Sequence, residues 1–105
     1  MKMLLLFLTC ANQAEADKIS TSLLEKHLVA CVKMMLISAK FLWEGKVDSS
    51  NEILLIMDSE ESKFDQVEQE VRKLHSYKTF VLTATEVKTS SAGVADWIKE
   101  SMQLT

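Results

Sequence analysis

His27 and Cys31 are two side chains that could bind a soft metal ion, and they stand four residues apart in the chain. In a helix this spacing places both on one face, where their ring nitrogen and sulfur atoms could bind the same ion. The alternative is structural, because a free cysteine most often packs as a small hydrophobic side chain. We adopt the structural interpretation for this pair.

Carboxylates and thioethers are two further ligand types in the chain. One acidic cluster is interpreted as a solvated helix face rather than a carboxylate cage: Glu60, Glu61, Asp65, Glu68 and Glu70. The six methionines, with Met34 and Met35 adjacent, could offer soft ligands to copper. They lie mostly in apolar runs, so we expect them to fill gaps in the core.

The chain carries little that indicates catalysis. Arg72 falls inside a predicted helix, and the loop of residues 9–12 contains neither glycine nor a basic residue to hold an anion. No serine or cysteine has a partner base at motif spacing. RNA recognition on a sheet would need exposed aromatic residues, and the candidate central strands offer only Phe7. We therefore predict that the protein is not an enzyme.

Composition limits the class of protein and its partners. The 105 residues, 26% charged and 48% hydrophobic, predict a single globular domain covering residues 1–105. A net charge of −3 provides no basic field, so we expect no nucleic-acid or membrane partner. Two cysteines are too few for a secreted disulfide scaffold, which favours a reducing cytoplasm.

The first ten residues resemble an export signal ending at Cys10. Their apolar core, residues 3–8, is shorter than the hydrophobic region of an export signal. A continuous apolar run of this length is typical of a buried strand. We predict a β-strand here.

Helical periodicity appears in three places. Asn12 with Glu15 is a capping signal before a helix over residues 13–30, and Asp58 with Glu61 repeats the signal before a helix over residues 59–75. A short amphipathic helix containing Trp97 follows Gly93.

A further strand is predicted between the second and third helices, within residues 77–87. Residues 79–83 are rich in strand-forming side chains.

The segment Trp43-Glu44-Gly45-Lys46 separates two apolar runs and predicts a long β-hairpin. Gly45 suits the bend because it can adopt positive φ, and we expect a polar turn over residues 47–51. The apolar runs are residues 32–42 and 53–57. The first strand is longer than a subunit of this size needs, so we expect part of it to pair with another subunit.

The predicted order is strand, helix, strand, strand, helix, strand, helix. This is the α+β, ferredoxin-like split βαβ arrangement with a long hairpin and a C-terminal helix. In it the first and third strands are central and the second lies at an edge, where unpaired backbone groups favour oligomerisation.

Several segments together are similar to the divalent-cation tolerance (CutA) family. They are Leu28-Val29-Ala30-Cys31-Val32, Phe41-Leu42-Trp43-Glu44-Gly45-Lys46, Glu52-Ile53-Leu54-Leu55-Ile56, His75-Ser76-Tyr77 and Asp96-Trp97-Ile98. The match spans nearly the whole chain. The resemblance implies a non-enzymatic homotrimer, cytoplasmic or organellar, with a role in tolerance of copper and other divalent ions.

The resemblance also implies site residues. Copper-binding members use a cysteine at the end of the first strand and paired histidines before the tyrosine, at positions that are here Leu8, Leu74 and His75. His75 is therefore the candidate metal ligand, for copper or zinc, and Cys10 is a possible substitute if the strand end bends. The expected interface or cleft residues are Phe41, Trp43, Glu44, Lys46, Tyr77, Lys78 and Trp97.

This chain departs from the family in ways that leave an alternative open. It has no proline, and Lys78 stands where the family has an acid near the tyrosine. A cation there disfavours a divalent metal and favours an anionic ligand. The alternative is therefore a trimer that binds a small effector, as the similar PII signalling proteins do, or that serves as an adaptor. His75 also has a purely structural alternative, as the residue that ends the second helix.

Overall fold

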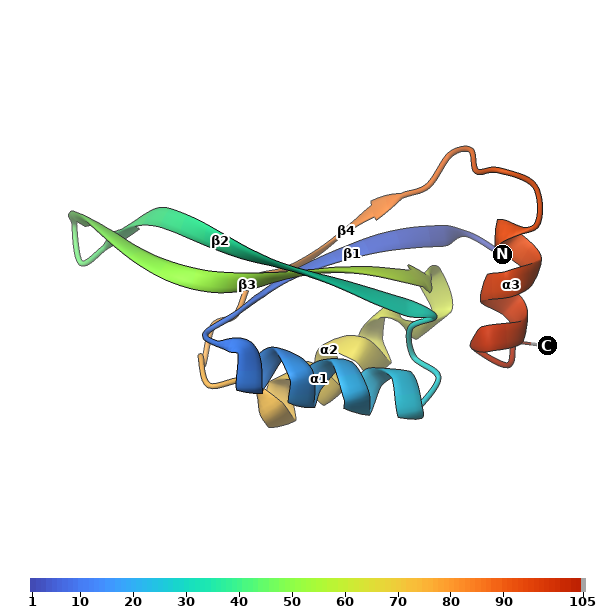
Figure 1. The fold of residues 1–105 in the computed structure, drawn as a ribbon, viewed down its shortest axis with the longest axis horizontal. Coiled ribbons are helices and arrows are strands. Elements are labelled where there is room, and N and C mark those ends of the chain that lie inside the picture. The colour runs from blue at the N-terminus through green and yellow to red at the C-terminus, as the bar shows by residue number, and fades with distance from the viewer. Residues whose placement is uncertain (105) are drawn as a thin grey trace.

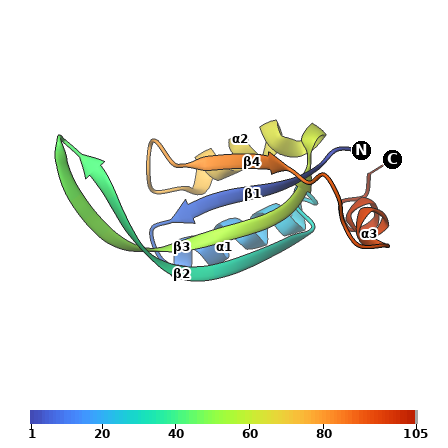
Figure 2. The same ribbon diagram turned by 90° about the horizontal axis from the view of Figure 1, so that it is seen from above.

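The computed structural model describes residues 1–104, and its centre is an antiparallel sheet with strand order β2-β3-β1-β4. In chain order the elements are β1 (Met3–Cys10), α1 (Gln13–Glu25), β2 (Cys31–Trp43), β3 (Lys46–Glu60), a 3-10 turn (Glu61–Lys63), α2 (Phe64–Leu74), β4 (Leu82–Glu86) and α3 (Val94–Ser101). Helices α1 and α2 cover one face of the sheet, and α3 lies at the end where both termini are found (Figure 1). This is the ferredoxin-like arrangement predicted from the sequence, with β1 and β3 central and β2 at an edge, as Figure 2 shows from above.

Strand β1 is apolar along its whole length, but only alternate side chains are buried. Leu4, Leu6, Leu8 and Cys10 are buried in the core, and the residues between them are half-exposed. A β-strand directs successive side chains to opposite faces of its sheet, so the buried set packs under α1 and α2. The second apolar face of β1 is therefore not fully covered by this chain.

Helix α1 is shorter than predicted and ends at Glu25 rather than at residue 30. His27 adopts a left-handed conformation with φ 57°, the His27 N–H donates to Leu24 O, and the Leu28 N–H donates to Leu23 O at 2.9 Å. This pair of bonds is a Schellman termination, which usually uses glycine at the left-handed position. Because Cys31 begins β2, His27 and Cys31 do not share a helix face, and the ligand spacing inferred from a continuous helix is wrong.

The long hairpin is confirmed, but its turn is tighter than predicted. Only Glu44 and Gly45 connect the strands, with φ values of 50° and 78°. Two successive positive φ values are the signature of a primed two-residue turn, which matches the twist of the flanking strands. Residues 47–51, expected as a polar turn, instead belong to β3 and pair with residues 38–42 of β2.

Helix α2 begins later than predicted because Asp58 and Glu61 are not its cap. Strand β3 continues to Glu60, whose carboxylate accepts a 3.0 Å hydrogen bond from the Ser62 N–H and caps the 3-10 turn. Asp58 lies instead 3.1 Å from Lys33 Nζ of the neighbouring strand. The helix ends as expected, with His75 as its C-cap.

The acidic cluster does not form the solvated helix face that the sequence suggested. Glu60 and Glu61 lie outside the helix, and Glu70 is buried. The Glu70 carboxylate lies 2.8 Å from Lys26 Nζ and accepts a 2.6 Å hydrogen bond from the Ser22 hydroxyl. Glu70 therefore ties α2 to α1.

The C-terminal part of the chain follows the prediction with one shift. Strand β4 starts at Leu82, three residues after the expected run begins, and it pairs antiparallel with β1. Gly93 has φ 91° and directly precedes α3, as expected.

Candidate metal site at the end of β1

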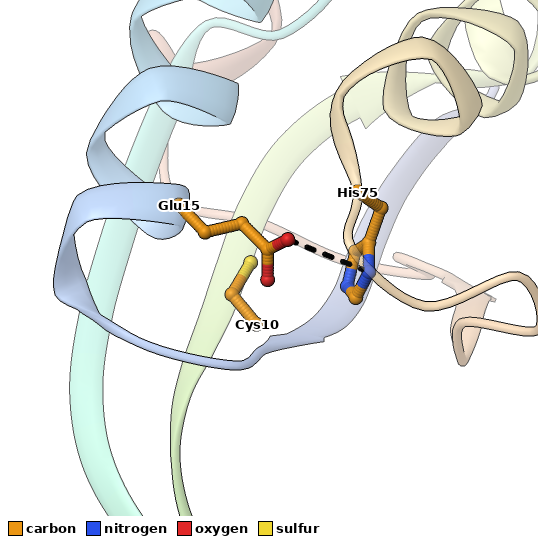
Figure 3. A group of neighbouring side chains, drawn as sticks. All are labelled: Cys10, Glu15 and His75. Carbon is orange, nitrogen blue, oxygen red and sulfur yellow. Dashed lines mark ion pairs between the residues drawn. The ribbon is translucent and has the colours of Figure 1, made fainter.

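Three side chains with metal-binding atoms meet where β1 ends. Cys10 is the last residue of β1, Glu15 lies in the first turn of α1, and His75 caps α2. One sulfur, one carboxylate oxygen and one ring nitrogen from these residues all lie within 4.8 Å of one another. Figure 3 shows Glu15 reaching from α1 toward His75, with the Cys10 thiol beside it.

The start of α1 fixes Glu15. The Asn12 side chain accepts a 2.9 Å hydrogen bond from the Glu15 N–H, and Glu15 Oε2 accepts a 2.7 Å bond from the Ala11 N–H. The bond to Asn12 caps the helix start and confirms the capping signal seen in the sequence, whereas the second bond ties Glu15 to the residue before the N-cap. The second carboxylate oxygen of Glu15 accepts a hydrogen bond from the Ser76 N–H and lies 3.8 Å from His75 Nδ1.

The end of α2 fixes His75, whose side chain is fully buried. Its Nδ1 atom accepts a 3.0 Å hydrogen bond from the Tyr77 N–H, and its Nε2 atom lies 2.8 Å from the carbonyl oxygen of Thr9. A backbone N–H can only donate and a carbonyl can only accept, so Nε2 carries the ring proton. The 3.8 Å contact with Glu15 is therefore no ion pair in this tautomer.

The surroundings set the charges of the other two side chains, Cys10 and Glu15. Burial raises the pKa of the Cys10 thiol to about 12, and the Glu15 and Glu52 carboxylates add to the rise. Burial would also raise the pKa of Glu15, but hydrogen bonds from Ala11 and Ser76 outweigh it and lower that pKa overall. At neutral pH, Glu15 is ionised and Cys10 keeps its proton.

This donor set fits a divalent ion of borderline softness. Sulfur, nitrogen and a single carboxylate suit zinc or copper better than the all-oxygen sites of calcium and magnesium. Two changes would accompany binding: the Cys10 thiol would lose its proton, and His75 would give up a hydrogen bond. The three residues can thus supply three ligands, one fewer than the four that zinc usually takes.

The structure brings together some of the sequence-predicted residues and separates others. Leu8 is buried in the core and Leu74 packs against it, and neither aliphatic side chain has a donor atom for a metal. Cys10, two residues further along β1 on the same face as Leu8, lies beside His75. Glu15 was missed as a ligand because its capping role already explained its position in the sequence.

The expected interface residues lie at separate places in the fold. Phe41, Trp43, Glu44 and Lys46 are at the hairpin tip, far from α3, which carries Trp97 (Figure 1). The Tyr77 ring packs 5.1 Å from that of His75, and the Lys78 carbonyl accepts a 3.3 Å hydrogen bond from Arg72.

Comparisons with known proteins agree with this fold. A family described as CutA1 divalent ion tolerance protein matches residues 4–101. The divalent-cation tolerance protein CutA of Archaeoglobus fulgidus is 35% identical over 98 residues, which are 93% of this chain and 96% of that protein. The CutA protein of Thermotoga maritima is 31% identical over 95% of this chain and 99% of its own length.

Solved structures extend the likeness to three dimensions. The structure of the periplasmic divalent cation tolerance protein CutA from Archaeoglobus fulgidus superposes with a TM-score of 0.93 at 34% identity, covering 95% of this chain and 98% of that one. CutA1 from Oryza sativa also gives 0.93, at 27% identity, covering 96% of this chain and 94% of that one.

The family name refers to divalent-cation tolerance and not to a catalytic activity. Among the helices described for residues 1–104, none is long and apolar enough to cross a membrane. With a family match over almost its full length and a relative at 35% identity, this chain belongs to the CutA1 divalent ion tolerance family.

Proposed function

We propose that this protein is a single-domain, non-enzymatic subunit of a homotrimer that acts in divalent-cation tolerance by binding copper or zinc at Cys10, Glu15 and His75. The observation that carries the proposal is the meeting of three different donor atoms, from three separate elements, within 4.8 Å. The relatives named for divalent-cation tolerance support the class of ligand.

The hairpin supports the trimer. Strand β1 pairs with β3 only over residues 53–60, so residues 46–52 of β3 pair with β2 alone. This two-stranded end of the hairpin, residues 37–52, forms an arm. Its large apolar side chains are exposed, with Leu42 at 77%, Val47 at 74% and Trp43 at 62%. A contiguous exposed apolar surface of this kind is typical of an interface, and an obligate interface resembles a core cut in half.

The state of the two cysteines supports a non-catalytic role in a reducing compartment, the cytoplasm or an organelle. Cys10 is buried with its pKa raised to about 12, so it is a poor nucleophile. Cys10 and Cys31 are both free thiols. A reducing compartment keeps Cys10 available as a metal ligand.

The test is native mass spectrometry of the metal-free protein titrated with zinc and with copper. We expect a trimer that binds the ion, and loss of that binding in Cys10→Ser and in His75→Ala. The chain offers matched controls, because Cys31→Ser and His27→Ala remove the only other cysteine and histidine and should leave metal binding intact. Equal metal uptake by His75→Ala and the parent protein would reject the site.

A second function is favoured by the hydrogen bonds of His75. Both ring nitrogens are satisfied without any metal, and the exposed Lys78 lies close to this ring in the chain. These features suit a trimer that binds an anionic effector, or an adaptor. A trimer that takes up neither zinc nor copper, but whose melting temperature rises with a nucleotide or carboxylate ligand in a Lys78-dependent way, would favour this alternative.

A further inference from the structure

We propose that metal binding and the present conformation of residues 75–81 exclude each other, so that the segment joining α2 to β4 rearranges when the site is filled. This inference rests on the proposed function and deepens it. Under this inference, metal binding changes the conformation of an exposed segment of the chain, residues 75–81.

The argument begins with the two nitrogens of His75. Nδ1 has one lone pair, and the Tyr77 N–H occupies it at 3.0 Å. Nε2 carries the proton, which it donates to the Thr9 carbonyl at 2.8 Å. A metal ligand must present a free lone pair, and neither nitrogen of this ring has one.

Either route to ligation breaks the same contact. If Nδ1 binds the ion, the Tyr77 N–H loses its acceptor. If Nε2 binds the ion, the ring proton moves to Nδ1. Two N–H donors, those of Nδ1 and of Tyr77, then face each other, and no hydrogen bond can form between them. In both cases the Tyr77 N–H, which lies at an exposed position, loses its acceptor in the protein, so the backbone there must shift to bond water or another partner.

Glu15 adds a second link to the same segment. Its carboxylate accepts the Ser76 N–H as well as the Ala11 N–H. The Glu15 oxygen that lies 3.8 Å from His75 Nδ1 is the same oxygen that accepts the Ser76 N–H. Drawing that oxygen toward an ion weakens its bond to Ser76, so two consecutive backbone amides lose their partners together.

The rest of the segment is assembled around the His75 ring. The Phe80 ring stacks on it at 5.3 Å and 25°, and the Arg72 guanidinium lies 4.7 Å from the Phe80 ring centre. Arg72 also donates to the Lys78 carbonyl. A change in the ring's position is therefore passed to residues 78–80 through direct contacts.

The outer side of this segment is accessible to a partner. Tyr77 is 40% exposed and Val81 is 62% exposed. The segment runs directly into β4, an edge strand of the sheet. A rearrangement here changes a surface that another molecule can contact, while the core below β1 stays in place.

Hydrogen exchange at the two amides tests the inference. The measurement compares exchange at Ser76 and Tyr77 in metal-free and zinc-loaded protein, with the Leu28 amide of the α1 terminus as internal reference. Loss of one hydrogen bond of about 1.4 kcal/mol speeds exchange about tenfold. We expect this acceleration at Ser76 and Tyr77 and no change at Leu28.

If zinc binding loosens residues 75–81, then loosening residues 75–81 must strengthen zinc binding, because linkage is reciprocal. Phe80→Leu removes the aromatic stacking on His75 and keeps an apolar side chain, so it loosens the segment without touching a ligand. An aromatic pair contributes about 0.5–1.5 kcal/mol, so this variant should bind zinc about twofold to tenfold more tightly than the parent. A purely structural role for Phe80 would weaken zinc binding or leave it unchanged.

Zinc stoichiometry, measured by native mass spectrometry on the same samples, separates the outcomes. Zinc uptake that depends on His75, with unchanged or slower exchange at Ser76 and Tyr77, overturns the inference and leaves the metal site standing. Uptake that does not depend on His75 also overturns it. If no zinc binds, the proposed metal function fails and the inference fails with it.

Discussion

The Nε2 atom of His75 lies 2.8 Å from the carbonyl oxygen of Thr9, so the last residue of the α2 terminus is bonded directly to the end of β1. Thr9 and His75 are 66 residues apart in the chain. Through this bond and the one from Tyr77, a single ring holds together the strand, the helix and the segment that leads to β4.

His75→Ala should therefore destabilise the fold as well as remove a proposed metal ligand. The fully buried ring makes two hydrogen bonds, and its loss removes both the bond from the Tyr77 N–H and the bond to the Thr9 carbonyl. We expect a loss of about 2 kcal/mol in the free energy of unfolding, measured with urea. Tyr77→Phe keeps the backbone donor and is the control. An unchanged unfolding midpoint in His75→Ala would mean that the ring has no structural role.

Glu70 should make stability depend on pH. Bonds from Lys26 and Ser22 lower the pKa of its carboxyl from 4.5 to about 2. Because the folded pKa lies below the unfolded one, the contribution is complete above about pH 4.5 and disappears as the pH falls toward 2. The unfolding midpoint of Glu70→Gln should be lower than that of the parent protein at pH 7, and the difference should shrink between these two values.

Glu68→Gln is the matched control for this experiment. Glu68 pairs with Arg72 at 2.6 Å on the more exposed side of the same helix. Exposed pairs contribute little, so Glu68→Gln should change the midpoint by less than Glu70→Gln does. Equal effects of the two substitutions would show that burial of Glu70 between the helices does not matter.

Trp43→Ala should shift the protein from trimer to monomer and lower its melting temperature. The side chain is 62% exposed in the isolated subunit, near the tip of an arm that extends beyond the rest of the sheet (Figure 2). Aromatic side chains of this kind often anchor interfaces. The control is Leu24→Ala on α1, where a 40% exposed leucine is replaced. Sedimentation analysis that finds the trimer intact in Trp43→Ala would remove this residue from the anchor role.

Glu44→Asn should stabilise the hairpin. Glu44 and Gly45 have φ values of 50° and 78°, and asparagine followed by glycine is the preferred pair for a turn with two positive φ values. We expect a gain of about 0.5–1 kcal/mol in thermal unfolding experiments. Gly45→Ala should have the opposite effect, because alanine is strained at the positive φ of this position. The added Cβ itself would meet no neighbouring atom. A loss of stability in Glu44→Asn would show that the Glu44 side chain makes a contact outside the subunit.

The sequence predicted the sheet order, the central strands and the hairpin because each depends on local patterns: apolar runs, Gly45 and the Asn12 cap. The end of α1 could not be predicted, because His27 occupies a left-handed position where glycine is the usual signal. The predicted start of α2 was wrong for a different reason. Asp58 resembled a helix cap, and only the register of β2 against β3 places Lys33 beside it.

The candidate site was predictable in part. His75 and Cys10 were identified through their positions relative to a family pattern, while Glu15 needed the folded chain. In the sequence, Asn12 and Glu15 form a capping signal, which gave no reason to assign Glu15 a second role. That Glu15 faces His75 depends on how α1 and α2 pack on the sheet, and no local pattern records this packing.

Because burial alternates along β1, the side chains on its two faces should differ in how well they tolerate substitution. Leu4, Leu6 and Leu8 are enclosed by the helices, whereas Leu5 and Phe7 between them remain half-exposed on the opposite face. Substitutions in the first set remove core contacts on which the fold depends. Substitutions in the second set leave those contacts intact, so the tolerance of β1 to mutation should rise and fall with a period of two residues. A library of variants across this strand would reveal that period directly.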